Sequence, residues 1–136
     1  MLARHQRLLA ALAMLLGSHS FVHAADKIGN ATATANEVKG VLDGKTDTIV
    51  TGSEVFSNQK IITSPASVAD LKFLDDVTMH VGPVSEILLD KYVYDPANPR
   101  NTVVIKVTQG AFKFISKVPG KSYEIITPMG TMGIRG

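Results

Sequence analysis

A chain of 136 residues has room for one domain. It contains no cysteine, which excludes a disulfide framework and a cysteine-linked lipid anchor. Its 14 basic residues outnumber its 12 acidic ones only through Arg4 and Arg7, so the chain after residue 24 is balanced and offers no basic stripe for nucleic acid.

The first 24 residues have the layout of a secretory signal peptide. The two arginines precede an apolar run, Leu8–Leu16, and the pair Val22 and Ala24 fits a signal-peptidase site. Crossing a bilayer takes about 20 apolar residues, whereas this run covers nine. We therefore predict cleavage after Ala24 and a periplasmic or secreted protein, with an uncleaved N-terminal anchor as the alternative.

Residues 25–36 are rich in alanine and small polar residues, and their apolar residues show no period. This composition predicts a flexible lead-in. The folded domain is accordingly expected to cover residues 37–136.

Beyond Glu37, short stretches rich in Val, Ile, Thr, Phe and Tyr recur between Gly, Pro, Asn and Asp. This spacing predicts an all-β domain of short antiparallel strands, and it leaves open a sandwich or a twisted solenoid-like coil. No part of this region has a helical period. The predicted strands cover residues 37–42, 47–50, 60–63, 68–74, 77–81, 85–94, 102–107, 110–117 and 122–127.

Several of these stretches alternate between apolar and polar residues, as half-buried strands do. The apolar positions of each stretch share one face, which we expect to line the core. The predicted inward residues are Ala69, Leu71, Phe73, Val77, Met79, Val81, Val103, Ile105, Val107, Phe112 and Phe114.

The connections between strands have their own residue signals. Asp75 and Asp76 form the polar gap of a tight hairpin, and residues 94–101 contain two prolines and predict a surface loop. Pro119 and Gly120 predict a turn, and Gly82 with Pro83 predicts a change of layer.

Few residues offer chemistry. His80 is the only histidine after the leader, and its place beside Thr78 on a polar strand face predicts a solvent-facing side chain that cannot form a metal site alone. The Asp75 and Asp76 pair is explained by the hairpin, since no calcium-loop spacing accompanies it.

Other combinations are weaker still. A triad of Ser85, His80 and Asp75 lacks a nucleophile elbow, and Met129 and Met132 are expected to fill an edge of the core. With one histidine and no cysteine after the leader, we predict a protein that is not an enzyme. We assign no catalytic, cofactor-binding or metal-binding residue and no cofactor.

The order of strands and turns resembles the FecR domain family. Thr51–Asp90 resembles its central motif, in which an alternating strand and an acidic turn lead to Gly-Pro-x-Ser and a leucine-rich strand. Val104–Gly136 resembles the remainder, which ends in Thr-Pro-x-Gly and Ile-Arg-Gly. Because a threonine and a further strand usually follow that ending in the family, the resemblance implies a fragment that stops inside the domain and leaves Ile134 in an exposed edge strand.

FecR-type regulators sense an outer-membrane iron transporter from the periplasm and control a sigma factor from the cytoplasm. The 136 residues show only a leader, without a cytoplasmic segment or a later membrane span. The resemblance therefore implies an exported binding or sensing module of the bacterial cell envelope, with a protein or envelope partner at a strand edge or sheet face. The alternative is a structural spacer or assembly module of a larger secreted or surface protein. An enzyme would require a carboxylate cluster in a deep pocket, and no residue implies iron.

Overall fold

The computed structural model describes residues 25–91, 103–117 and 121–135, where the chain forms twelve β-strands and no helix. The predicted signal peptide, the loop at 94–101 and the turn at Pro119 and Gly120 lie outside these residues. The strands are β1 Lys27–Ala35, β2 Val38–Leu42, β3 Lys45–Thr48, β4 Glu54–Phe56, β5 Lys60–Thr63, β6 Val68–Phe73, β7 Thr78–Val81, β8 Glu86–Lys91, β9 Val103–Gln109, β10 Phe112–Ile115, β11 Ser122–Thr127 and β12 Gly130–Arg135.

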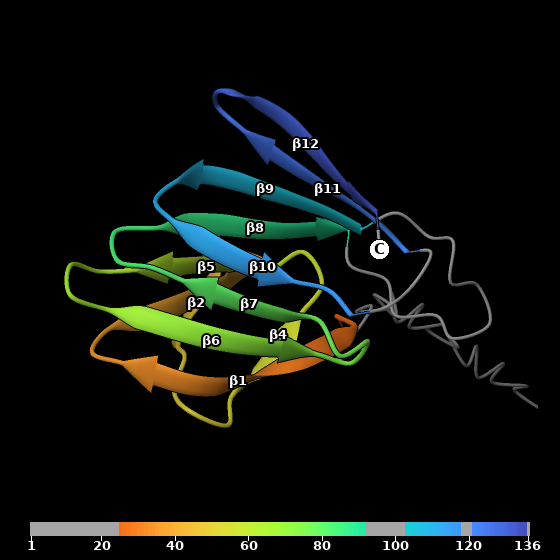
Figure 1. Ribbon diagram of the computed structural model, residues 1–136. Helices are drawn as coiled ribbons and strands as arrows, with labels where there is room; N and C mark the ends of the chain where they lie inside the picture. The colour runs from red at the N-terminus through yellow and green to blue at the C-terminus, as the bar shows by residue number, and fades with distance from the viewer. Residues whose placement is uncertain (1–24, 92–102, 118–120, 136) are drawn as a thin grey trace, which may run out of the picture.

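The strands form two sheets (Figure 1). The smaller sheet has the order β10-β7-β6-β1-β4, and the larger sheet has the order β12-β11-β9-β8-β5-β2-β3. All the strand pairs are antiparallel except β9 with β11. The all-β prediction is confirmed, with the two sheets stacked as a sandwich. None of the described residues belongs to a helix that could cross a membrane.

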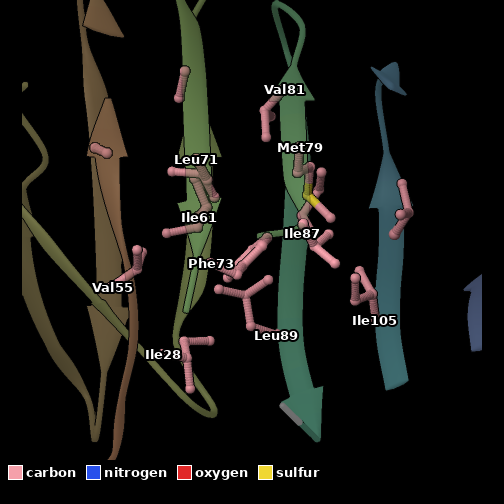
Figure 2. Packing of buried hydrophobic residues seen from close by; sticks show 14 of the residues in the cluster. Ile28, Val55, Ile61, Leu71, Phe73, Met79, Val81, Ile87, Leu89 and Ile105 are labelled. Carbon is pink, nitrogen blue, oxygen red and sulfur yellow. The ribbon is translucent and has the colours of Figure 1, made fainter. Parts of the chain in front are cut away.

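One apolar cluster fills the space between the sheets. Figure 2 shows Leu71, Phe73 and Met79 of the smaller sheet beside Ile61 and Ile87 of the larger one. The residues predicted to face inward belong to this cluster except Phe112 and Phe114, which are half-buried and pack against it. Because burying one large apolar side chain stabilises a fold by about 1.5–3 kcal/mol, this cluster is the main source of stability.

The predicted lead-in at residues 25–36 is wrong. Lys27–Ala35 form β1, which lies between β4 and β6 inside the smaller sheet. The strand contributes Ile28 and Ala31 to the core, but its register shifts between Lys27 and Gly29 and again between Ala31 and Ala33. Each shift interrupts the two-residue alternation, which is why the sequence of β1 shows no period.

Smaller differences concern short strands. The strand predicted at 47–50 is displaced to Lys45–Thr48, and Ile49 is buried just beyond it. The three-residue strand β4 was not predicted. The Asp75 and Asp76 turn is confirmed as the link between β6 and β7, where the Phe73 amide donates to the Val77 carbonyl at 2.8 Å.

A group of hydrogen bonds stabilises the point where the chain passes from β7 to β8 and changes sheet. We call this group the latch; it consists of Thr63, Gly82, Ser85 and Ala111. The Thr63 hydroxyl donates to the Gly82 carbonyl at 2.7 Å and accepts from the Ser85 amide at 2.9 Å. The Ser85 hydroxyl in turn accepts from the Ala111 amide at 3.2 Å, beside the passage from β9 to β10. The predicted change of layer at Gly82 and Pro83 is therefore confirmed, and this latch ties two sheet crossings together.

Candidate binding surfaces

A groove lies on the solvent-facing side of the smaller sheet. One part, of about 500 Å³, is bordered by Thr32, Asp70, His80 and Lys113. A second part, of about 460 Å³, shares Thr78 and Ile115 with the first. We call the two parts together the outer groove; the second part is also lined by Lys72, Asp76 and Lys117.

Strand register explains why polar side chains gather there. Asp70 of β6 pairs with His80 of β7, which pairs in turn with Lys113 of β10. Directly opposed residues share a face of an antiparallel sheet, and this face is the one opposite to Leu71 and Met79 in the core. The expected solvent-facing position of His80 is confirmed, since its side chain is 48% exposed and its Nδ1 contacts Asp70 Oδ1.

The predicted hairpin acids have separate environments. Asp76 is exposed and lies 3.7 Å from Lys72 Nζ, whereas the side chain of Asp75 is 6% exposed and contacts Lys121 Nζ. No group of three or more potential metal ligands occurs among the described residues. The two carboxylates thus serve two different contacts and do not converge on one cation.

A buried polar cluster surrounds Asp75 at the border of the core. The Tyr123 hydroxyl donates to Asp75 Oδ2 at 3.5 Å and accepts from the Ser116 hydroxyl at 3.2 Å. The Lys121 ammonium lies 5.6 Å from the centre of the Tyr123 ring. Phe114 packs edge-on against that ring, with centroids 4.8 Å apart. We missed this cluster in the sequence because Asp75 and Lys121 are 46 positions apart and no local pattern joins them.

Burial raises the pKa of the Tyr123 hydroxyl above its ordinary value of 10.0, and the nearby Asp75 carboxylate raises it further. The folded protein therefore keeps this proton to a higher pH than the unfolded chain. The contribution of the protonated Tyr123 hydroxyl to the free energy of unfolding is fully present below pH 10. This contribution is lost as the pH rises through the higher pKa that the hydroxyl has in the folded state.

Above pH 10, we expect the free energy of unfolding to decrease less steeply with pH in Tyr123→Phe than in the unmodified protein. The two slopes should differ by at most about 1.4 kcal/mol per pH unit, because the variant lacks this one proton. Urea unfolding of both proteins at several pH values on either side of 10 measures the two slopes. Equal slopes would show that the Tyr123 hydroxyl does not titrate differently in the folded state.

The three members of the rejected triad belong to different contacts. Ser85 is 1% exposed, and its hydroxyl is engaged by backbone groups of Pro83 and Ala111. His80 faces Asp70 on the outer surface, and Asp75 faces Lys121. Ser85 therefore has an architectural role in the latch.

The expectation that Met129 and Met132 fill a core edge is wrong. Met129 is 96% exposed in the turn between β11 and β12, and Met132 is 49% exposed. Met132 lies opposite Ile125, so it is on the core-facing side of the larger sheet. Its exposure shows that the smaller sheet does not cover this end, where β11 and β12 form the outermost hairpin (Figure 1).

The outer edges of the two sheets differ in how they are protected. β3 has four residues and carries Lys45 and Asp47, β4 has three residues, and β10 has four with Lys113 at its centre. Short length and charge are the usual means of blocking unwanted strand pairing. β12 has six residues, one charge at Arg135 and no proline, so it is the least protected edge in the described part of the chain.

Comparison with known proteins gives one match. A family model described as FecR protein matches residues 59–136, more than half of the chain. This range contains every residue of the latch and also the hairpin of β11 and β12. No curated protein and no solved structure matches the chain.

Proposed function

Because this chain belongs to the FecR protein family, we propose that it is an exported, non-catalytic binding or sensing module of the bacterial cell envelope. Family membership supports the envelope role, and the first 24 residues support export. The hydroxyl groups of Thr63 and Ser85, two polar residues of the matched range, are engaged in the latch, which supports an architectural use of these groups over a catalytic one.

The observation that carries the proposal is the β12 edge. An extended partner segment can add a strand to such an edge through backbone hydrogen bonds. On the core-facing side, apolar side chains of the partner would cover the exposed Met132 and the half-buried Ile134. Burial of this apolar surface favours association. The partner would be a protein with an extended segment whose alternate residues are apolar.

A photo-reactive amino acid at Met129, placed in the full chain and expressed in its native cells, tests this contact. We expect a discrete adduct that Met132→Lys reduces by about tenfold, because a lysine on the core-facing side of β12 places a charge against the apolar partner. Mass spectrometry identifies the adduct. The same probe at Lys45, on the opposite edge of the larger sheet, is the matched control and should give no such product.

Three outcomes would contradict the proposal. Equal adducts from Met129 and Lys45 would indicate random encounters, and an adduct insensitive to Met132→Lys would place the partner elsewhere. Cross-linking of the hairpin to another part of the same polypeptide would favour a spacer or assembly module. Envelope fractionation with N-terminal sequencing tests export separately, with Ala25 as the expected first residue.

A further inference from the structure

The outer groove has more positive charge than its own acids neutralise. Its two carboxylates are both engaged, one with His80 and one with Lys72. Lys113 and Lys117 also line the groove, and neither forms an ion pair with another described residue. Two ammonium groups are therefore available to an anionic ligand.

The uncharged part of the lining narrows the choice of ligand. Thr32 and Thr78 supply hydroxyl groups, and Ile115, which is 40% exposed, supplies an apolar surface between the lysines. Among the described lining residues the only ring is the His80 imidazole, which is already engaged by Asp70, so the groove offers no Phe, Tyr or Trp platform on which nucleic-acid bases could stack. Hydroxyl, apolar and cationic groups together match a polypeptide that carries carboxylates beside apolar side chains.

We propose that the outer groove docks an acidic, extended polypeptide segment of a partner protein. Carboxylates of the segment pair with Lys113 and Lys117, and one of its apolar side chains covers Ile115. The groove belongs to the smaller sheet and the β12 edge to the larger one. This site therefore goes beyond the strand-addition contact proposed above, and each of the two contacts can fail without the other.

A fluorescently labelled oligo-glutamate peptide is the probe, and anisotropy with the full chain is the measurement. Low ionic strength is required because salt screens surface charges. We expect Lys113→Glu with Lys117→Glu to weaken binding by about tenfold, since two attractions become repulsions. Lys91→Glu, on an exposed residue of β8, is the single-charge control and should change the affinity by less than about twofold.

A second pair of variants separates charge from folding. Lys113→Gln with Lys117→Gln removes the charges without introducing repulsion, and it should weaken binding by a smaller factor while the melting temperature stays unchanged. Met132→Lys should leave oligo-glutamate binding intact, because it lies on the other sheet. That result distinguishes this site from the contact at β12.

Three results would contradict the proposed docking of an acidic polypeptide segment in the outer groove. Absence of oligo-glutamate binding, or equal weakening by Lys91→Glu and by the Lys113 and Lys117 variants, would overturn the proposal. Lysine-dependent binding of polygalacturonate without binding of oligo-glutamate would assign the groove to an anionic glycan and would also overturn it.

Discussion

Replacement of Gly110 by alanine is expected to lower the free energy of unfolding by about 3 to 5 kcal/mol, which is a large part of the stability of a small domain. Gly110 has a φ of +96°, a region that residues with a side chain rarely adopt. A Cβ atom there would also lie 2.0 Å from the Ser85 hydroxyl oxygen and 2.5 Å from Ser85 Cα. Because one of these atoms is backbone, a rotamer change cannot relieve the overlap.

Gly44→Ala is the matched control for this prediction. Gly44 has a φ of +76°, but no described atom beyond Gly44 and its two chain neighbours lies within 4 Å of the position that its Cβ would occupy. Only the backbone cost of about 1 kcal/mol therefore applies. Urea unfolding of the two variants measures the difference. Equal losses would mean that Gly110 is required for its backbone angle alone and that the close approach to Ser85 contributes nothing.

The expected effect at Gly110 shows what some residues of the matched range, residues 59–136, contribute to the fold. Thr63, the turn from Gly82 to Ser85, and Gly110 are distant from one another in sequence, yet they meet where two sheet crossings touch. Each residue type is explained there by a hydrogen bond or by a lack of space. These residues of the matched range therefore have architectural roles in the sandwich, whereas the contacts proposed at the outer groove and at β12 use other residues.

The core was predictable because burial follows a simple period along most strands. Leu71, Phe73 and Met79 could be assigned from alternation alone, since β6 and β7 pair without a register shift. β1 could not, because two shifts interrupt its alternation. The sequence predicts a strand through its period, and a bulged strand loses that signal although it is equally well packed.

The candidate surfaces were less accessible from the sequence. The position of His80 on a polar face was predicted, but its row with Asp70 and Lys113 depends on the pairing of three strands. The prediction that Met132 is buried was wrong, although Met132 does lie on the core-facing side of its strand. Residue alternation identifies the face of a strand, but it does not show whether the opposite sheet extends far enough to cover that face. Surfaces of this kind follow from strand order, which local patterns do not contain.

The buried Asp75 and Lys121 pair leads to the second large effect. Both side chains are less than a tenth exposed, so each charge has lost most of its water. Lys121→Met removes the ammonium that faces the buried carboxylate, and we expect it to destabilise the fold by about 3 to 5 kcal/mol. Lys27→Met, which breaks the exposed pair with Glu54, should cost less than about 1 kcal/mol in the same urea unfolding measurement.

The double variant Asp75→Asn with Lys121→Met tests the cause of that loss. If the cost of Lys121→Met comes from an uncompensated buried charge, neutralising Asp75 should recover more than half of it, because two neutral groups have no such penalty. Additive losses would instead show that each side chain stabilises the fold through packing and hydrogen bonds. A recovery would mean that the pair adds little net stability, and that the fold loses stability mainly when one of the two charges is buried without the other. Because the pair joins the end of β6 to the start of β11 across 46 positions of the sequence, it would then contribute to the choice of fold.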